Sequence, residues 1–449
     1  MSTQSNSEKI KKEKDDIKEG IVSRLSFNKK ITIEADDKVY NSKDALPGER
    51  VLFRKRRKSV EIIEIKSSPY IKNINCPVQD RCGGCRFREL DYLDEYTIKD
   101  MELKRLSDEL NCEYLGLYTP TATEGYRNKM EYTFGDEIKG GSLKLGLHEK
   151  GKFHNIIEYD NCRLVPKNMD RIKKSIREFA ENSGYNFYHR FNNSGYFRHL
   201  VIRHSLYEDK YLLNIVTTSI GELDLDQLIA KLKEDKLLPT IKGIYHTIND
   251  AVSDAIVVDK IELIYGEADL IEKLDDKLFP IGPLSFFQTN TIAADELYKY
   301  VREIVEEADE LWDLYAGSAI IGALLSDKAN KIYSVEINPA NILDAKKMLE
   351  LNDIKNVTPV LADCKDFVLK EDKADFIIVD PPRTGLHPKV VDAINNSHVD
   401  KIIYVSCNPV TAVSNVIMMD NYRVLNLKGF DNFRATLNVE IVLILEKIK

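Results

Sequence analysis

The strongest constraint on the fold comes from the part of the chain after about residue 280, where short apolar runs alternate with helical patterns. Five apolar runs have the length of buried strands, at 311–315, 331–336, 357–361, 374–379 and 402–405. A helical pattern, such as the one from Asn338-Pro339 to about residue 352, follows the second run. This alternation is typical of a parallel sheet covered by helices. Two last runs, 422–427 and 439–446, are expected to form an antiparallel hairpin.

The loop after the first of these runs suggests a cofactor site. Ala316-Gly317-Ser318-Ala319 forms the turn into a helix, and the next strand ends in Glu336, 19 residues after Gly317. At this offset a carboxylate can hold a ribose hydroxyl, although an ordinary surface acid is the alternative. Ala319 stands where a phosphate-cradling Gly-x-Gly-x-x-Gly loop has its second glycine. This substitution favours a cofactor without a pyrophosphate over NAD.

Cys407 follows the apolar run 402–405 and precedes Asn408-Pro409, which stops the strand. Sheets of this class build their ligand crevices at the carboxyl ends of the strands. A thiol in this place can act as a nucleophile if its surroundings support the thiolate. The alternative is a small buried hydrophobe, which is the usual role of a free cysteine.

A second group of cysteines indicates a metal centre. Cys76, Cys82 and Cys85 form a Cys-x5-Cys-x2-Cys cluster on a loop rich in Pro and Gly. Its two glycines allow backbone amides to approach the sulfurs, which stabilises the negative charge of a cluster. A fourth soft ligand is needed, from Cys112, Cys162 or a histidine. We favour Cys162, which follows a strand-like segment, whereas Cys112 ends a helical pattern. The spacing leaves both zinc and an iron–sulfur cluster open.

The N-terminal region has a different character. After a charged tail, four or five short β-like runs between Gly20 and Ile65 predict a small barrel of the oligonucleotide-binding kind. Residues 1–75 contain 18 Lys and Arg against 12 Asp and Glu, although the whole chain has a net charge of −8. The basic run 54–58 favours contact with RNA or DNA. A solvated face on a structural or dimerising barrel is the alternative.

The length, the composition and the number of cysteines are those expected of a multidomain protein of the cytoplasm. The 449 residues are 43% hydrophobic and 31% charged, which allows two to four domains. No apolar run of eighteen residues predicts a membrane span, and the charged N-terminus does not resemble a secretory signal. The seven cysteines are an odd number, which argues against a disulfide framework and favours metal binding or catalysis.

Between these regions, segments 125–135 and 196–204 interleave cations with aromatic residues. Such strands can stack bases and hold phosphates, or they can be ordinary amphipathic strands. The chain is therefore divided into five parts: a disordered tail (1–14), an RNA-binding β-barrel (15–70), a cysteine segment (71–92), a central α+β RNA-binding domain (93–265) and a catalytic domain (266–449).

Five motifs occur in order: the Cys-x5-Cys-x2-Cys cluster, SFFQTN (285–290), DLYAGSAIIG (313–322), DPPRTG (380–385) and SCNP (406–409). Together they resemble the RNA 5-methyluridine methyltransferases, specifically the iron–sulfur-containing 23S rRNA (uracil-5-)-methyltransferases with an N-terminal TRAM barrel. The resemblance covers about residues 15–449. It implies an α/β fold, with a Rossmann-like class I S-adenosylmethionine methyltransferase domain, the N-terminal barrel and an inserted α+β central domain.

The resemblance also implies the roles of individual residues. It assigns S-adenosylmethionine binding to Gln288, Tyr315, Glu336 and Asp380. It makes Cys76, Cys82, Cys85 and Cys162 the ligands of a 4Fe–4S cluster. Cys407 becomes the nucleophile and Glu440 the general base. The expected partner is RNA, 23S rRNA first, with no membrane and no obligate protein partner, so that a cytoplasmic monomer is expected.

The last motif departs from the family. The family pattern Phe-Pro-His-Thr-x-His-x-Glu is replaced at 433–440, where Arg434, Ala435 and Asn438 stand for the proline and the two histidines. Thr436 and Glu440 are kept. The change bears on how the target base is oriented. Two alternatives follow: a tRNA-directed enzyme with the same chemistry, and a catalytically silent RNA-binding or chaperone protein.

The chemistry explains why these residue types are needed. Carbon 5 of uracil is too weakly nucleophilic to attack a sulfonium methyl, but a thiolate added at carbon 6 makes it an enolate carbon. The methylated adduct must then lose its carbon-5 proton to a base, the role expected of Glu440. Arg383 shares the exit loop of Asp380, where it lines the crevice or forms a structural salt bridge. The target base must leave its stack to reach the thiol.

Overall fold

The computed structural model describes residues 17–42, 44–56, 59–71, 76–87, 89–371 and 373–448. The predicted tail 1–14 and the last two residues of the basic run, Arg57 and Lys58, lie outside the described residues. Among the helices described, none is long and apolar enough to cross a membrane.

The N-terminal strands form a five-stranded antiparallel sheet in the order β3-β2-β1-β4-β5. Its strands are β1 (Ile17–Leu25), β2 (Ile31–Ala35), β3 (Lys38–Ser42), β4 (Arg50–Lys55) and β5 (Val60–Ser67). In β2 the side chains of Ile31, Ile33 and Ala35 face the core, as the period of a strand requires. Asp36 and Asp37 join β2 to β3 with positive φ angles of 49° and 56°, the geometry of a type I′ hairpin turn.

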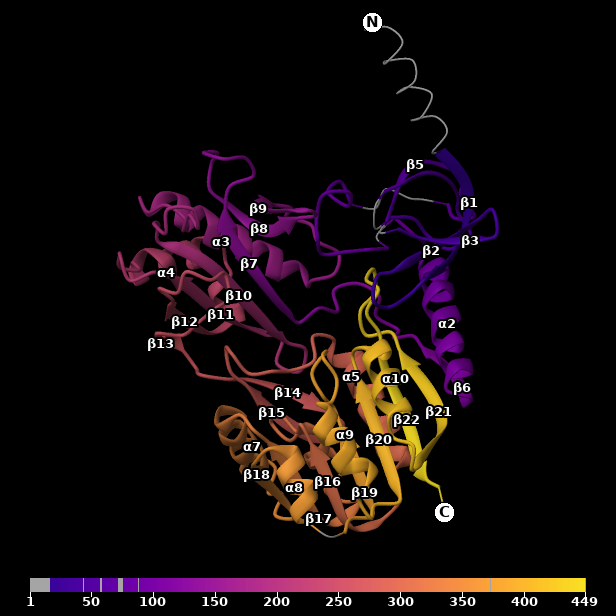
Figure 1. Cartoon of the computed structure of the whole chain (residues 1–449). Coiled ribbons are helices and arrows are strands. Elements are labelled where there is room, and N and C mark those ends of the chain that lie inside the picture. The colour runs from indigo at the N-terminus through magenta and orange to yellow at the C-terminus, as the bar shows by residue number, and fades with distance from the viewer. Residues whose placement is uncertain are drawn as a thin grey trace, which may run out of the picture.

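A long helix, α2 (Tyr92–Glu109), connects this sheet to the rest of the molecule, and β6 (Glu113–Tyr118) follows it (Figure 1). Arg24 of β1 donates to both carboxylate oxygens of Glu102 on α2. Strand β6 then pairs in parallel with β21 at the edge of the C-terminal sheet. One helix and one strand therefore connect the N-terminal sheet to the C-terminal one.

The central part contains a seven-stranded sheet in the order β13-β12-β11-β10-β7-β8-β9. Its elements are β7 (Lys129–Gly135), β8 (Lys144–Glu149), β9 (Lys152–Ile157), α3 (Lys167–Asn182), β10 (Phe197–Ser205), β11 (Lys210–Thr217), α4 (Leu225–Glu234), η1 (Leu238–Thr240), β12 (Ile241–Ile248) and β13 (Lys260–Gly266). A separate hairpin, β14 (Leu270–Leu274) and β15 (Lys277–Ile281), leads into the C-terminal part.

The C-terminal part is the predicted α/β unit, and the prediction of fold class is confirmed. Its eight-stranded sheet has the order β18-β17-β16-β19-β20-β22-β21-β6. The elements are α5 (Thr291–Ile304), β16 (Ala308–Leu314), α6 (Ile320–Leu324), β17 (Ala329–Glu336), α7 (Pro339–Leu351), β18 (Val357–Leu361), α8 (Cys364–Lys370), β19 (Phe376–Val379), α9 (Pro388–Asn395), β20 (Lys401–Ser406), α10 (Pro409–Ile417), β21 (Tyr422–Phe430) and β22 (Glu440–Lys447). The hairpin of β21 and β22 is antiparallel, as expected.

Both faces of this sheet are buried, which explains the continuous apolar runs in its strands. In β20, Ile402 and Tyr404 pack into one core with α8, α9 and α10, whereas Ile403 and Val405 pack into the other with α5, α6 and α7. The two cores lie on opposite sides of the sheet, because successive side chains of a strand point to opposite faces.

Candidate active site

Four of the predicted site residues lie at the carboxyl ends of adjacent parallel strands. In the register of the sheet, Leu314 of β16 pairs with Val335 of β17 and with Val379 of β19. Val379 in turn pairs with Tyr404 of β20. Tyr315, Glu336, Asp380 and Cys407 all lie within three residues beyond these pairs, along one edge. Strand order reverses between β16 and β19, and ligands bind at such a switch point.

The glycine loop after β16 is hydrogen-bonded to the side chain of Glu336. The Gly317 amide donates to one carboxylate oxygen of Glu336 at 3.0 Å, and the Asn338 amide donates to the other at 2.7 Å. Tyr315, Gly317 and Ala319 all have positive φ angles, between 55° and 60°. Ala319 thus adopts the left-handed conformation that a glycine would adopt more easily. These two hydrogen bonds hold the carboxylate of Glu336 in one orientation at the end of β17.

Asp313 was not predicted as a site residue, although it is the single acid in the apolar run 311–315. Its side chain is completely buried, and one oxygen accepts from the Gly322 amide at 3.1 Å and from the Ser334 hydroxyl at 2.9 Å. A side chain at Gly322 would collide with Ser334 and Asp313, so glycine is required there. Burial raises the pKa of Asp313 to about 7. The residue fixes the start of α6 beneath the loop.

Cys407 and Glu440 face each other across the antiparallel pair β20 and β22. Ser406 pairs with Ile441, so the next position places Cys407 opposite Glu440. Glu440 is 1% exposed, and neither carboxylate oxygen has a hydrogen-bond partner among the described residues. Burial and the nearby Asp380 raise the pKa of Glu440 well above its ordinary value. Burial, followed by the charges of Glu440 and Asp380, raises the pKa of the Cys407 thiol to about 12.

Asp380 completes a group of acids around the thiol. Burial and the charge of Asp313 raise the pKa of Asp380 to about 7. Arg383, on the same exit loop, favours the charged forms of both Cys407 and Glu440. Its guanidinium donates to the side-chain oxygen of Asn438 at 2.8 Å. This partner is an amide, and no ion pair of Arg383 is found among the described residues, so the alternative of a structural salt bridge gains no support.

Gln288 joins the same site from the segment before α5. It is 8% exposed, and its backbone carbonyl accepts from the side chain of Asn128, in the central part of the chain, at 2.9 Å. Arg203, also from the central part, donates to the carbonyls of Pro283 and Ser285. The central part therefore holds this segment against the catalytic sheet.

Tyr298 of α5 is a further residue of the site. It is 5% exposed, and its pKa is raised far above the ordinary value by burial and then by the charges of Asp380 and Glu440. A hydrogen bond to Gln288 acts in the opposite direction. Tyr298 occupies a core position of an amphipathic helix, so no sequence signal distinguishes it from a packing residue.

The four cysteines predicted to bind a cluster gather around one cavity. Cys76, Cys82, Cys85 and Cys162 all line this space of about 50 Å³, and the Gly84 amide donates to the Cys82 sulfur at 3.4 Å. Cys112, the other candidate, packs elsewhere, against the core formed by α2, the N-terminal sheet and the C-terminal sheet. In the described ranges, no three Cys, His, Asp or Glu residues are arranged closely enough to hold a metal ion. The donors are gathered but are not in ligating geometry.

The cysteine segment contacts the altered motif 433–440 directly. The amides of Arg86 and Phe87 donate to the Ala435 carbonyl at 2.6 and 2.9 Å. The Ala435 amide donates to Glu95 of α2 at 2.8 Å. Ala435 is 2% exposed and has a φ angle of 65°. Where the family pattern has a histidine, this chain therefore has a buried turn residue that packs beside Cys85 and Cys162.

A buried ion network holds the start of this motif. Lys99 of α2 is completely buried and contacts Glu95 at 2.5 Å and Asp431 at 2.8 Å. Its ammonium also donates to the Phe433 carbonyl at 3.4 Å, and Tyr92 donates to Asp431 at 3.2 Å. The segment that leads to Glu440 is thus fixed to α2 by charges that water does not reach.

Comparison with known proteins identifies the family. The family model described as tRNA (Uracil-5-)-methyltransferase matches residues 282–448. An uncharacterized RNA methyltransferase of Caldanaerobacter subterraneus subsp. tengcongensis is 36% identical over 414 residues, 89% of this chain and 92% of its own length. One of Clostridium acetobutylicum is 36% identical over 426 residues, 92% of this chain and 93% of its own length.

Two archaeal proteins extend the comparison. The tRNA (uracil(54)-C(5))-methyltransferase of Pyrococcus horikoshii is 30% identical over 378 residues, 84% of this chain and 87% of its own length. The crystal structure of the Pyrococcus abyssi tRNA (uracil-54, C5)-methyltransferase in complex with S-adenosyl-L-homocysteine matches 95% of this chain and 100% of its own, with a TM-score of 0.73 and 24% identity. This match supports the fold. Taken together, the sequence relatives and the family model show that the chain belongs to the RNA (uracil-5-)-methyltransferases.

Proposed function

We propose that this protein methylates carbon 5 of uridine in RNA, with 23S rRNA as the first candidate substrate, through a covalent adduct with Cys407. The observation that carries the proposal is the position of the Cys407 thiol opposite Glu440, at the strand ends that also bear Glu336 and Asp380. We assign S-adenosylmethionine binding to Gln288, Tyr315, Glu336 and Asp380. S-adenosylmethionine supplies the methyl group, and the carboxylates hold the donor in the crevice.

The proposed reaction follows from the chemistry of the two facing residues. The Cys407 thiolate bonds to carbon 6 of the uracil, and the displaced electron pair makes carbon 5 nucleophilic enough to take the methyl group. Glu440 then removes the proton from carbon 5, and the carbon–sulfur bond breaks to release the thiolate and the product. Because the pKa of Glu440 is raised, its carboxylate is a stronger base than an exposed one.

The raised pKa of Cys407 implies that the thiol of the RNA-free protein is protonated at neutral pH. The thiol must lose this proton before it attacks. Arg383 lowers the pKa of the thiol, and a positively charged methyl donor in the crevice would act in the same direction. The order of binding is therefore expected to matter: the nucleophile becomes active once the donor is present.

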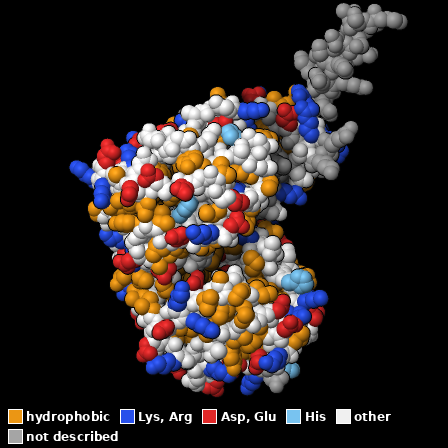
Figure 2. All heavy atoms as spheres, turned by 90° about the vertical axis from the view of Figure 1, so that its left-hand side faces the viewer, with side chains coloured by type: hydrophobic (Ala, Val, Ile, Leu, Met, Phe, Trp, Pro, Cys, Tyr) orange, Lys and Arg blue, Asp and Glu red, His pale blue; other side chains and the backbone are white. Residues whose placement is uncertain are grey.

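RNA binding is proposed for the N-terminal and central parts, with the boundaries 15–70 and 93–265. On the face shown in Figure 2, Lys and Arg side chains are interspersed with Asp and Glu, and they form no broad basic surface. The described part of the basic run includes Lys55 and Arg56, both exposed on the N-terminal sheet. Recognition is therefore expected to depend on local groups rather than on a long-range positive field.

For the cysteine segment, 71–92, we propose that Cys76, Cys82, Cys85 and Cys162 hold a 4Fe–4S cluster. Four thiols around one cavity, with an amide donor on a sulfur, are a suitable donor set. Since the reaction transfers a methyl group and no net electron, the cluster is expected to shape the RNA-binding surface. Protein purified without oxygen should be brown and contain about four irons. Colourless protein with bound zinc would refute the assignment.

A tRNA-directed enzyme is the second candidate. It is favoured by the similarity to the Pyrococcus horikoshii relative, a tRNA (uracil(54)-C(5))-methyltransferase that matches 84% of this chain. The active-site geometry is the same for both substrates, because the reacting base is uridine in each case.

The experiment that tests the function is a map of 5-methyluridine in the rRNA and tRNA of a deletion strain. Loss of the modification from one or two rRNA positions, restored by wild type but not by Cys407→Ala, is the expected result. Loss from tRNA alone would select the second candidate. If every 5-methyluridine remains while the purified protein binds RNA, the protein is a silent RNA-binding or chaperone protein and the proposal is wrong.

A further inference from the structure

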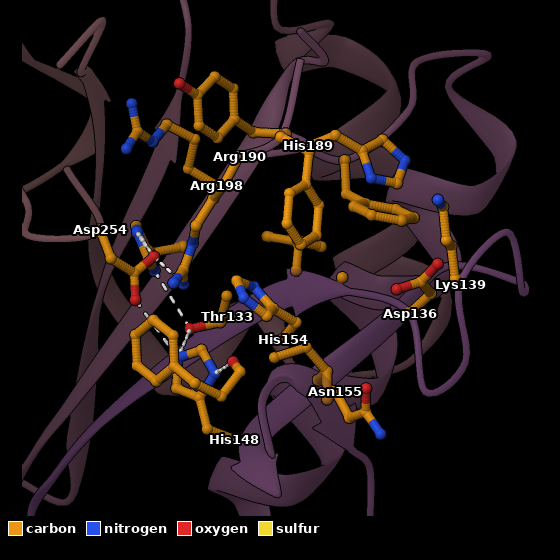
Figure 3. A pocket seen from close by; sticks show the side chains of 18 of the residues that line it. Thr133, Asp136, Lys139, His148, His154, Asn155, His189, Arg190, Arg198 and Asp254 are labelled. Carbon is orange, nitrogen blue, oxygen red and sulfur yellow. Dashed lines mark hydrogen bonds and ion pairs between the residues drawn. The ribbon is translucent and has the colours of Figure 1, made fainter. Parts of the chain in front are cut away.

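The central domain contains a second cavity, of about 570 Å³, which shares no lining residue with the cysteine cavity. It lies between β7, the hairpin of β8 and β9, the segment 187–192 and β10 (Figure 3). Four of the eight histidines of the chain line it: His148, His154, His189 and His199. Its volume is within the range of small-ligand pockets.

Exposed aromatic rings form the mouth of this cavity. Phe191 is 77% exposed and Phe153 is 53% exposed, and both lie on the same rim. The His148 ring stacks on Phe153, with centroids 4.4 Å apart and an interplanar angle of 14°. Arg190 lies over the same ring, 4.3 Å from its centroid, and the His154 ring lies 4.6 Å from that of Phe191. Flat surfaces of this kind can receive a base.

The carboxylates of the cavity are already engaged by the protein. Asp254 pairs with Arg190 and lies 3.4 Å from the His148 ring nitrogen. Asp136 accepts from the Gly140 amide at 2.7 Å. Figure 3 shows Asp254 beside Arg190 and Arg198 on one side, with Asp136 and Lys139 on the other. The charge of Asp254 is thus paired with that of Arg190, and Asp136 is engaged by a backbone amide.

Arg198 has a structural role in the wall of the cavity, because its guanidinium is bonded to the protein itself. It is 2% exposed, and its guanidinium donates to the carbonyls of Asn249 and Ala251 at 2.7 and 2.6 Å, and to that of Ser253. These bonds fix the loop that carries Asp254. The aromatic rings of the mouth therefore stand on a rigid support.

Strand β7 connects this cavity to the active site. Thr133 lines the cavity, and Asn128, just before the same strand, donates to the Gln288 carbonyl. Five residues of extended chain span about 17 Å. One folded RNA can therefore reach both places at once.

We propose that this cavity binds an unstacked nucleotide of the RNA substrate other than the methylated uridine. The base would stack on the exposed ring of Phe191, and Lys139 would contact the phosphate. This inference rests on the proposed function, since it assumes an RNA substrate. The composition of the lining favours RNA over a peptide. Nine of the lining residues are aromatic or histidine, and the only aliphatic side chain in the lining is that of Ile156.

The test compares Phe191→Ala and Lys139→Ala with the control Tyr207→Ala, whose ring is 56% exposed on the turn between β10 and β11. The probes are transcribed fragments of 23S rRNA and a tRNA transcript, taken with the full-length protein at several salt concentrations. Phe191→Ala should raise the Kd by roughly 5- to 140-fold, the range measured for the loss of one base–aromatic stack, without changing the salt dependence. Lys139→Ala should reduce the salt slope by about one. The control should match wild type.

A wild-type Kd for Phe191→Ala on the probe that wild type methylates would overturn the inference. The kcat at saturating RNA should stay unchanged in both variants, and a lower kcat with an unchanged Kd would also contradict it. If wild type methylates no probe, the proposed function fails. The binding comparison on those RNAs still decides the inference, because it needs no methyl transfer.

Discussion

At the scale of single residues, the site is defined by acids that hold their protons. Cys407, Glu440 and Asp380 all have pKa values raised first by burial. Asp380 further raises the pKa values of Glu440 and Cys407, and Glu440 raises that of Cys407. A binding crevice for a sulfonium donor benefits from this arrangement, because the positive charge of the donor is paired with carboxylates that ionise when it arrives.

The first prediction concerns the reactivity of Cys407 in the RNA-free protein. Its pKa is raised to about 12 by burial and then by Glu440 and Asp380, so the thiolate fraction should increase about tenfold per pH unit from pH 7 to pH 10. Mass spectrometry of the Cys407 peptide after brief treatment with iodoacetamide measures this rate separately from the other cysteines. A rate that levels off at or below pH 8 would contradict the assigned environment.

The second prediction concerns Glu440→Gln. The variant keeps the shape of the side chain but cannot accept the carbon-5 proton, so product release should slow by about 10²- to 10⁴-fold. The methylated RNA–protein adduct should accumulate, which gel electrophoresis under denaturing conditions detects. Normal turnover without adduct would show that another group is the base.

The pH dependence of the free energy of unfolding provides a control for Glu440→Gln. The raised pKa means that the folded protein holds this proton more tightly than the unfolded chain, so wild type loses stability as the pH rises above about 4.5. Glutamine does not titrate. The free energy of unfolding of the variant relative to wild type should therefore increase from pH 5 to pH 8.

Two site residues could not be identified from the sequence. Tyr298 occupies a core position of α5, and its nearness to Asp380 and Glu440 depends on how α5 packs on the sheet. Asp313 is the single acid in the apolar run 311–315, but its hydrogen bonds to Gly322 and Ser334 depend on how β16, β17 and α6 pack together. The roles of Cys407, Glu440 and the four cofactor-site residues stay predictions, and the structure brings these residues to one edge of the sheet.

At the scale of elements, the strands of the C-terminal sheet were predicted well because both of its faces are buried. Their apolar runs are continuous, so their positions follow from composition alone. Pro359 interrupts the third apolar run, and it is tolerated there because β18 is an edge strand, where a backbone N–H is not needed for pairing on the outer side. Strand β6 could not be predicted as part of this sheet. It pairs with β21, more than 300 residues away, and local patterns do not encode such a contact.

The interleaved segment 196–204 shows the limit of local patterns in another way. We expected a strand with exposed cations and aromatics, or an amphipathic strand, but every residue of β10 is buried. Arg198 and Arg203 donate to backbone carbonyls there. The strand lies between β11 and β7 near the centre of its sheet, where charged side chains persist only when such partners satisfy them.

The third prediction tests the buried network that fixes the loop before Glu440. Lys99→Met leaves Glu95 and Asp431 buried without their cation, which should cost about 3–5 kcal/mol of stability. The matched control is Lys104→Ala on the same helix, which removes an exposed pair with Asp108 and should change stability by less than about 1 kcal/mol. Denaturant unfolding measures both. Equal effects in the two variants would show that the network does not stabilise the fold.

At the scale of the whole molecule, the active site is assembled from parts far apart in sequence. The cysteine segment and α2 hold the motif 433–440 from one side, and the central domain holds the segment before α5 through Asn128 and Arg203. The C-terminal sheet supplies Cys407 and the strand ends that bear Tyr315, Glu336 and Asp380. A ligand bound to the outer parts would therefore act on the geometry at Cys407 through these contacts.

The most direct test of the central claim uses RNA in which the target uridine is replaced by 5-fluorouridine. Fluorine replaces the hydrogen that Glu440 would remove, so the adduct cannot be resolved after methyl transfer. With S-adenosylmethionine, wild type should form a protein–RNA complex that survives denaturation, with the RNA attached to the Cys407 peptide, and Cys407→Ala should form none. A complex that forms equally with Cys407→Ala, or attachment at another residue, would contradict the account.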